Sequence, residues 1–312
     1  MKRALVTGGA GFIGSHLVEG LLARGYAVRV LDNFATSTRD NLAGVAPQIE
    51  ISEGDVRNLT TVRAAMRNVQ IVFHHAALPS VTRSVQNPLE SNEVNTTGTL
   101  NVLLAARDAG VARVVYAASS SAYGDTPTLP KEETMPAHPL SPYAISKLAG
   151  EQYMRVFWEL YGLSTISLRY FNIFGPRQDP TTQYAGFIAK VISCALEKQP
   201  YPIFGDGEQT RDFTYVDNAV RANLLAAEVE LNESPTLNVA CGTRISLKQV
   251  IAIVNELTGQ NLAAHYLPPR AGDIRDSQAS LKRSAEILDY APAVDVREGL
   301  KRTLEWYKKN GR

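Results

Sequence analysis

A glycine-rich turn near the start of the chain constrains the fold more than any other feature. Residues 4–17 read ALVTGGAGFIGSHL, so a short apolar run leads into Gly8, Gly11 and Gly14 and then into an amphipathic segment. These glycines permit a tight turn, a close approach of the backbone to a pyrophosphate, and close packing of a helix on a sheet. The helix that follows presents free N–H groups to phosphates. Between a strand and a helix, the pattern predicts a dinucleotide-binding turn.

Short apolar runs alternate with longer amphipathic segments through the first half of the chain. The runs are rich in Val and Ile, which is typical of buried parallel strands, and they lie at residues 4–6, 27–31, 49–52, 70–73, 113–117 and 165–168. The amphipathic segments predict helices at residues 12–24, 59–67, 88–109 and 142–161. Strands that alternate with helices predict an α/β fold, a Rossmann-type doubly wound parallel sheet.

The pattern changes after Tyr170. Gly, Pro and aromatic residues cluster in FNIFGPRQDPTTQY and again in YPIFGDGEQTRDFTY. Further helices are predicted at residues 185–197, 247–257 and 297–309, and a strand at 236–240. We therefore predict two domains: a dinucleotide-binding domain over residues 1–170 and a smaller C-terminal α/β lobe for the substrate over residues 171–312. Segments within 214–240 are expected to return to the first domain.

Composition excludes several classes of protein. Lys and Arg number 32 and Asp and Glu 31, with no long block of like charge, which argues against a nucleic-acid partner. Two cysteines, Cys194 and Cys241, provide neither a disulfide framework nor a metal site. The apolar start breaks at Gly8, too early for a signal peptide, and no uncharged apolar stretch is long enough to span a membrane. We expect a cytoplasmic protein that binds small molecules and no metal.

An acidic residue at the end of the second predicted strand indicates which dinucleotide is bound. Asp32 follows Gly14 by 18 residues, and a carboxylate at that place accepts the hydroxyls of an adenine ribose. It would repel the 2′-phosphate of NADP, and no arginine directly follows it, so the predicted cofactor is NAD. Asp55, after the third strand in EGDVRN, is a candidate contact to the adenine amine.

Tyr143 and Lys147 form a candidate catalytic pair in the segment SPYAISK. In a helix that begins at Pro142, both side chains lie on one face. The ordinary pKa of tyrosine is about 10, and a neighbouring ammonium and a positive nicotinamide ring would both favour the phenolate form that acts as a base. The segment SSSAYG begins at Ser119, at the end of a central strand, where ligands bind in an open sheet. These residues together predict a catalytic site beside the cofactor.

These motifs together resemble those of one family. GGAGFIG, Asp32, HHAA at 74–77, VNTTGT around Asn95, SSSAYG, YAISK and LRYFN match the pattern of the extended short-chain dehydrogenase/reductases. Within this group the chain is most similar to nucleotide-sugar 4-epimerases of the UDP-glucose/UDP-N-acetylglucosamine type, from residue 1 to about residue 305. The resemblance implies transient oxidation of a UDP-sugar at C4 by NAD, rotation of the 4-keto sugar, and return of the hydride to its other face.

The resemblance also implies roles for individual residues. The catalytic residues would be Ser119, Tyr143 and Lys147. The cofactor would contact Gly8, Gly11, Phe12, Ile13, Gly14, Asp32, Asn33, Asp55, Val56, Ala76, Leu78, Asn95, Tyr143, Lys147 and Tyr170. The substrate would contact Ser80, Val81, Ser121, Asn172, Phe204, Arg211, Arg270, Asp273 and Ser277. Among these, Arg211 and Arg270 would hold the diphosphate, Asp273 the uridine ribose and Phe204 the uracil; planar guanidinium groups suit phosphate because they donate two hydrogen bonds at once.

One position bears on the choice of sugar. Some relatives have a bulky tyrosine where this chain has Ser277, and that tyrosine narrows the pocket near C2 of the sugar. The small side chain predicts room for a 2-acetamido group, so we expect N-acetylated UDP-hexoses to be accepted as well as UDP-glucose and UDP-galactose.

Alternative activities differ in how well the sequence fits them. A 4,6-dehydratase of this fold carries an Asp-Glu pair after the catalytic hydroxyl, where this chain has Ser120 and Ser121, so dehydration is disfavoured. A UDP-glucuronate 4-epimerase or decarboxylase stays open, with Arg177 in GPRQ as the candidate partner of a C6 carboxylate. A non-catalytic NAD-binding regulator is a remote alternative. Family members commonly form dimers through two helices each, so a homodimer through segments 88–109 and 142–161 is expected.

Overall fold

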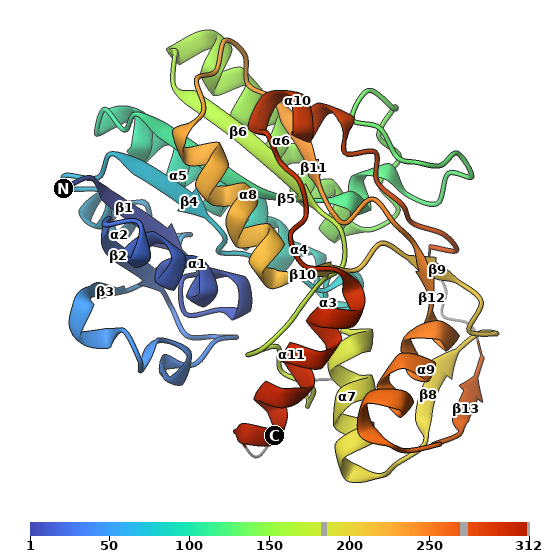
Figure 1. Cartoon of the computed structure of the whole chain (residues 1–312). Helices are drawn as coiled ribbons and strands as arrows, with labels where there is room; N and C mark the ends of the chain where they lie inside the picture. The colour runs from blue at the N-terminus through green and yellow to red at the C-terminus, as the bar shows by residue number, and fades with distance from the viewer. Residues whose placement is uncertain (182–185, 269–273, 311–312) are drawn as a thin grey trace.

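The computed structural model describes residues 1–181, 186–268 and 274–310 (Figure 1). Its centre is a sheet of seven parallel strands in the order β11-β6-β5-β4-β1-β2-β3. The strands are β1 (Arg3–Thr7), β2 (Ala27–Asp32), β3 (Ile49–Glu53), β4 (Ile71–His74), β5 (Arg113–Ser119), β6 (Ser164–Tyr170) and β11 (Thr236–Val239). The strand order reverses at β1 and β4, so the predicted doubly wound sheet is confirmed, and ligands bind at such a reversal.

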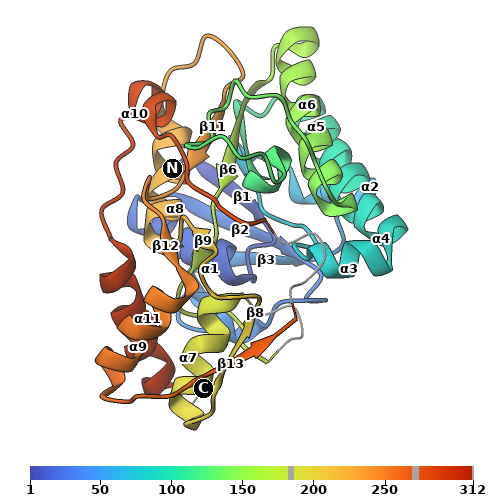
Figure 2. The same cartoon turned by 90° about the vertical axis from the view of Figure 1, so that its right-hand side faces the viewer.

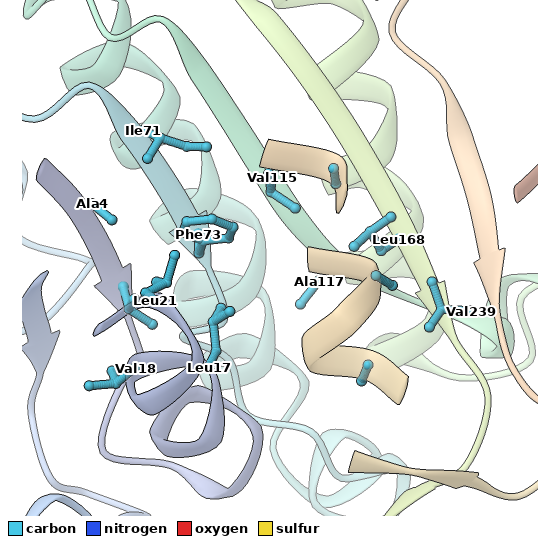
Figure 3. Close-up of a cluster of buried hydrophobic side chains, with 14 of the residues drawn as sticks. Ala4, Leu17, Val18, Leu21, Ile71, Phe73, Val115, Ala117, Leu168 and Val239 are labelled. Carbon is cyan, nitrogen blue, oxygen red and sulfur yellow. The ribbon is translucent and has the colours of Figure 1, made fainter. Parts of the chain in front are cut away.

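Helices cover both faces of this sheet (Figure 2). One face carries α1 (Phe12–Ala23) and α8 (Val216–Glu228), and the other carries α2 (Leu59–Ala65), α5 (Gly98–Asp108) and α6 (Pro142–Tyr161). Apolar side chains of α1, such as Leu17, Val18 and Leu21, pack on Phe73 and its neighbours in the sheet (Figure 3). Strands buried on both faces explain why the sequence shows continuous apolar runs rather than alternation.

The predicted helix over residues 88–109 is not regular. It divides into α4 (Pro88–Asn92), a π-helical turn (Glu93–Thr97) and α5. Pro88 stands in the first turn, and the Asn87 side chain caps the helix by accepting a hydrogen bond from the N–H of Glu90 at 3.3 Å. A π-helical turn inserts an extra residue into the helix and often marks a functional site. Here it contains the buried Asn95.

The second part of the chain builds a smaller lobe below the sheet (Figure 1). The helices α7 (Phe187–Glu197), α9 (Leu247–Thr258) and α11 (Val296–Lys309) share a buried apolar cluster with β8 (Tyr201–Phe204), which pairs with β13 (Ala264–Leu267). The remaining strands and α-helices of the described residues are β7 (Ile173–Phe174), β9 (Thr210–Arg211), β10 (Thr214–Tyr215), β12 (Ile245–Ser246), α3 (Val81–Gln86) and α10 (Lys282–Leu288). Short 3-10 helices lie at Arg39–Leu42, Ala46–Gln48 and Ser120–Tyr123. Among the described residues, no helix is both long and apolar enough to cross a membrane.

Candidate active site

The glycine turn joins β1 to α1 so closely that side chains are excluded. Gly8 has a φ of +69°, and a Cβ atom there would lie 2.6 Å from the backbone nitrogen of Ala76. A Cβ atom at Gly14 would lie 2.2 Å from the carbonyl oxygen of Gly8. Gly11 is the N-cap of α1, and none of the described side chains caps this helix. The open N–H groups at this helix N-terminus fit the pyrophosphate of NAD.

Asp32 lies at the carboxyl end of β2, beside this turn, and is 7% exposed. Its Oδ2 atom accepts a hydrogen bond from the N–H of Ala10 at 2.9 Å. Its Oδ1 atom accepts hydrogen bonds from the N–H of Phe34 at 2.9 Å and the hydroxyl of Ser37 at 2.8 Å. A carboxylate has about four acceptor sites, so the chain itself uses three. Its orientation fits a contact to the adenine ribose, which remains a prediction.

Asp55 is held in place at the rim of the same end of the sheet. Its Oδ2 atom accepts hydrogen bonds from Nη2 of Arg57 at 2.7 Å and Nδ2 of Asn33 at 2.9 Å. The hydrogen bonds from Arg57 are the main cause that lowers the pKa of Asp55 to about 2. Val56 is buried beneath it. The sequence analysis did not single out Arg57, whose partner Asp55 lies only two residues away.

Ser119, Tyr143 and Lys147 come together at the carboxyl end of β5. Ser119 is the last residue of β5, and Tyr143 and Lys147 lie one turn apart in the first two turns of α6. The Tyr143 hydroxyl lies close enough to Ser119 for that side chain to act on its pKa. The Nζ atom of Lys147 donates a hydrogen bond to the carbonyl oxygen of Ala117 at 2.7 Å. The helix begins at Pro142 as predicted, and Ser141 caps it, because its hydroxyl accepts a hydrogen bond from the N–H of Ala144 at 3.1 Å.

Burial controls the charge of both residues. It raises the pKa of Tyr143 above its ordinary value, and the side chain of Ser119 acts against this rise. Burial lowers the pKa of Lys147 to about 7, and the negative charge of Glu151 acts in the opposite direction. The expectation that a neighbouring ammonium and the nicotinamide ring together favour the phenolate of Tyr143 therefore stays a prediction.

Asn95 joins the loop after β4 to α6. Its Oδ1 atom accepts a hydrogen bond from the N–H of Leu78 at 2.8 Å, and its Nδ2 atom donates to the hydroxyl of Ser146 at 3.0 Å. Asn95 is 1% exposed. The described hydrogen-bond partners of Asn95 are thus protein groups, which fits a residue that supports the cofactor site. Further along this loop, the hydroxyl of Ser80 accepts a hydrogen bond from the N–H of Arg83 and caps α3, and Val81 is exposed.

His74 links the glycine turn to Asn95, and sequence reasoning gave it no role of its own. Thr99 donates its hydroxyl proton to the carbonyl oxygen of Asn95 at 2.5 Å, so it accepts from Nε2 of His74 at 2.9 Å. Nδ1 of His74 must then accept from the hydroxyl of Thr7 at 2.7 Å. Burial lowers the pKa of His74 well below its ordinary value, which fits this neutral form. A short motif such as HHAA does not reveal such a chain, because Thr7 and Thr99 are distant in sequence.

Tyr170 lies at the end of β6, next to β5. Its hydroxyl accepts a hydrogen bond from Nδ2 of Asn223 at 2.6 Å, and its ring stacks on that of His75 with centroids 6.0 Å apart. Nε2 of His75 lies 3.3 Å from Oδ1 of Asn223. Asn223 belongs to α8, so the second half of the chain supports a residue that the resemblance assigns to the cofactor site.

The other predicted substrate residues that the structure describes lie in four places. Ser121 lies directly after β5, and its hydroxyl is 2.9 Å from that of Ser119. Asn172 follows β6 and donates a hydrogen bond from Nδ2 to the carbonyl oxygen of Asp212 at 3.2 Å. Arg211 and Ser277 lie on neighbouring segments, since the N–H of Ser277 donates to the carbonyl oxygen of Thr210 at 3.1 Å. Phe204 ends β8 and is partly buried. Arg270 and Asp273 lie outside the described residues.

Asp212 forms hydrogen bonds that hold together the segments containing Arg211 and Ser277. Its carboxylate accepts hydrogen bonds from the backbone N–H groups of Cys241 at 2.9 Å, Gly242 at 3.0 Å and Ala279 at 3.1 Å. Burial raises the pKa of Asp212 to about 7, and the three N–H groups act against this rise. Sequence analysis did not identify this residue, because its partners lie 29 to 67 positions away.

Arg177 does not lie where a partner for a C6 carboxylate would be needed. Its guanidinium pairs with Glu19 of α1, and it lines a cavity of about 260 Å³ together with Asp40, Asn41, Trp306 and Asn310. Arg177 therefore lies against α1 and α11 and not with Ser119 and Tyr143. The expectation that Arg177 contacts a uronic acid is therefore not supported.

The described residues offer neither a cluster of metal ligands nor a cysteine that is ionised at neutral pH. No group of three or more His, Cys, Asp or Glu residues in that part of the chain could hold a metal ion. Both cysteines are free. Burial raises the pKa of Cys241 to about 12 and raises that of Cys194 as well, so both thiols stay protonated at neutral pH.

The chain matches known proteins over its whole length. The UDP-glucose 4-epimerase of Mycolicibacterium smegmatis is 38% identical over 311 residues, which cover 98% of each chain. A crystal structure of the UDP-glucose 4-epimerase of Thermotoga maritima with UDP-glucose has a TM-score of 0.95 at 37% identity, over 99% of this chain and 100% of that one. The complex of the Thermus thermophilus UDP-glucose 4-epimerase with NAD has a TM-score of 0.90 at 39% identity, over 98% and 99%.

Related enzymes act on other UDP-sugars. A UDP-glucuronate 4-epimerase of Thermodesulfobacterium geofontis is 34% identical over 317 residues, which cover 98% of this chain and 96% of that one.

The family described as NAD dependent epimerase/dehydratase matches residues 4–240. Together with the glycine turn, these matches show that the cofactor is NAD. The chain therefore belongs to the NAD dependent epimerase/dehydratase family, as an enzyme of the UDP-sugar 4-epimerase type.

Proposed function

We propose that the enzyme interconverts the C4 epimers UDP-glucose and UDP-galactose and also UDP-N-acetylglucosamine and UDP-N-acetylgalactosamine. The observation that carries the proposal is the arrangement of Ser119, Tyr143 and Lys147 at the carboxyl end of β5. Only β4 separates β5 from β1 and its glycine turn. A base, a hydroxyl and an ammonium beside a nicotinamide site are the groups that reversible oxidation of an alcohol needs.

The chain's own groups move a proton and orient the sugar. The acceptor and donor of the C4 hydride would be supplied by bound NAD. Tyr143 takes the proton of the 4-hydroxyl, directly or through Ser119, whose side chain acts on the pKa of Tyr143. Because burial alone raises the pKa of Tyr143, the positive nicotinamide ring is needed to favour the phenolate. Lys147 binds the nicotinamide ribose from its position beneath Tyr143.

The diphosphate end is held in place while the sugar turns. Arg211 lies between Thr210 and Asp212, and its Nη1 atom donates to the carbonyl oxygens of Thr210 at 2.9 Å and Arg275 at 3.1 Å. These contacts orient its guanidinium, and Asp212 fixes the strand that carries it. We assign the diphosphate to Arg211 and Arg270, the uracil to Phe204 and the uridine ribose to Asp273.

Neutral hexoses fit the described site better than uronic acids. Arg177, the cation that the sequence offered for a C6 carboxylate, is paired with Glu19 elsewhere. Ser277 is small, and its buried position beside Arg211 supports a pocket that accepts an acetamido group at C2. We therefore place UDP-glucuronate third among the candidate substrates.

The enzyme is proposed to act as a homodimer. Large apolar side chains are exposed on α3, on α4 and in the first turn of α6: Val81, Val85, Leu89 and Ile145. Leu160 and Tyr161, at the other end of α6, are exposed as well. These three helices contact one another, so the first four side chains lie on one side of the molecule. An exposed apolar patch of this kind indicates an interface, and a second copy related by a twofold axis would cover it with the same patch.

A direct assay tests the proposed substrates. The purified protein is incubated separately with UDP-glucose, UDP-N-acetylglucosamine and UDP-glucuronate, and the products are resolved by NMR. We expect C4 epimers of the first two, with no net accumulation of reduced nicotinamide. Tyr143→Phe is expected to bind NAD and to lose nearly all activity. Turnover of UDP-glucuronate alone would contradict the proposal.

A further inference from the structure

A buried ion pair lies directly behind the catalytic residues. Glu151 of α6 and Arg169 of β6 are 3% and 5% exposed, and they form two hydrogen bonds, Nε to Oε1 at 2.9 Å and Nη2 to Oε2 at 2.7 Å. Among the ion pairs of the described residues, this is the one in which both side chains are buried. Apolar side chains of similar size stabilise a fold as well as such a pair or better. Stability alone therefore does not account for it.

Glu151 follows Lys147 by one helical turn, so the two side chains lie on the same face of α6. Lys147 is 4% exposed and directs its ammonium group to the carbonyl oxygen of Ala117. The residue after Ala117 in β5 is the register partner of Arg169 in β6. The ammonium and the ion pair thus face the same stretch of β5, just before Ser119.

The other groups around Lys147 do not supply a counter-charge. Tyr143 lies on the same helix, Tyr116 of β5 places its ring 4.9 Å from Nζ, and His74 and His75 lie at the end of β4. Burial lowers the pKa of both histidines and raises the pKa of both tyrosines, so all four are neutral. Among the described residues, Glu151 is the acid whose charge acts on Lys147.

Arg169 fixes the position of the Glu151 carboxylate relative to Lys147. It engages both carboxylate oxygens, so Glu151 is not drawn into a direct contact with Lys147, whose Nζ atom stays on Ala117. The Arg169 guanidinium also lies 4.6 Å from the centroid of the Tyr123 ring, in the turn that follows Ser119. The ion pair is thereby fixed on both sides, between α6 and the Ser119 turn.

We propose that Glu151, held by Arg169, is a positioning residue that keeps the buried ammonium of Lys147 protonated while leaving it free to contact ligands. This inference rests on the proposed catalytic role of Lys147. It explains why a costly ion pair is buried behind the site: a carboxylate at a fixed distance supports the positive charge without binding it. Loss of Glu151 would release the proton of Lys147 at lower pH.

The test removes both charges, so that no unpaired charge is left in the interior. The Glu151→Gln/Arg169→Met variant is compared with Arg155→Met/Glu159→Gln, which removes an exposed ion pair of the same helix. The titration of Lys147 is followed by NMR in protein labelled with ¹³C at lysine Cε, its signal assigned by its loss in Lys147→Met. The dependence of kcat and KM on pH is measured with UDP-glucose.

We expect the titration midpoint of Lys147 to fall by about one pH unit or more in Glu151→Gln/Arg169→Met. The high-pH limit of kcat should move down with it, so that kcat at neutral pH falls by about fivefold or more, while KM changes by less than about twofold. Glu151→Asp should restore most of the activity, and the Arg155→Met/Glu159→Gln control should behave as the wild type.

A folded double variant with an unchanged Lys147 midpoint and an unchanged kcat profile would overturn the inference. If charge removal prevents folding, Arg169→Lys is tested instead, because it keeps the positive charge but loses the contact to both carboxylate oxygens of Glu151. This variant is expected to shift the titration midpoint of Lys147 upward. An unchanged midpoint would overturn the inference. Full activity of Lys147→Met would instead refute the proposed role of Lys147, a separate result.

Discussion

Gly14 packs so closely on Gly8 that a Cβ atom at position 14 would lie 2.2 Å from the Gly8 carbonyl oxygen. This contact holds the first turn of α1 against the end of β1. It leaves the backbone N–H groups of Phe12 and Ile13 without an acceptor among the described residues, and Asp32 accepts a hydrogen bond from Ala10 of the same turn. We therefore expect cofactor binding to depend on the absence of a methyl group at position 14.

Gly14→Ala is expected to abolish retention of NAD and to lower the free energy of unfolding by about 2 kcal/mol or more, because backbone atoms must move to admit the methyl group. NAD content after purification and chemical denaturation measure the two effects. Gly44→Ala is the matched control, since a Cβ atom there meets nothing within 4 Å. Equal behaviour of the two variants would contradict the proposed role of Gly14.

The sequence predicts this part of the molecule well because it is encoded locally. The strand, the three glycines and the helix are adjacent in the chain, and Asp32 ends the next strand, so spacing alone places them together. By contrast, Asp212 receives hydrogen bonds from Cys241, Gly242 and Ala279, and no local pattern announces such distant partners. The π-helical turn around Asn95 was missed because residues 88–109 have the periodicity of an ordinary helix.

Lys147→Met is expected to stabilise the protein in a manner that depends on pH. The pKa of Lys147 is about 7 in the folded chain against an ordinary 10.5. The unfolded chain therefore holds a proton more tightly, and the buried ammonium costs stability that is fully present below about pH 7 and disappears as the pH rises through 10.5. We expect a gain of at least about 1 kcal/mol near neutral pH, measured by denaturation across this range. A gain that does not shrink with rising pH would contradict this assignment.

Ser277→Tyr is expected to change substrate choice. Ser277 is 8% exposed, so a bulky side chain would occupy space beside the sugar. The kcat/KM for UDP-N-acetylglucosamine should fall by about tenfold or more relative to that for UDP-glucose. Because the two substrates are compared in one variant, a general loss of folded enzyme cancels. An equal loss for both sugars would show that Ser277 does not set the size of the pocket.

Leu89→Asp is expected to dissociate the proposed dimer. Leu89 is 76% exposed on α4 and neighbours the other apolar side chains of the patch, so a carboxylate there would be buried without a partner on association. The molar mass from light scattering should fall from that of two chains to one. Tyr266→Asp, at an exposed position on β13, is the control. A wild-type protein that is already monomeric would refute the proposal.

The family resemblance predicted more residues of the candidate site than the spacing of residues in the sequence did. Phe204, Arg211 and Ser277 lie on separate segments of the second lobe, and no periodicity in the sequence relates them to Tyr143. The structure brings Arg211 and Ser277 onto neighbouring segments. It also separates Arg177 from the catalytic residues, because this arginine pairs with Glu19 on α1, a partner 158 positions away.

The fate of the hydrogen at C4 tests the central claim most directly. UDP-glucose that carries deuterium at C4 is incubated with the enzyme in ordinary water, and the UDP-galactose formed is analysed by NMR and mass spectrometry. We predict that deuterium is retained at C4 and that no reduced nicotinamide accumulates, because the same hydride leaves and returns. Replacement of the deuterium by solvent hydrogen, or net formation of reduced nicotinamide, would contradict this mechanism.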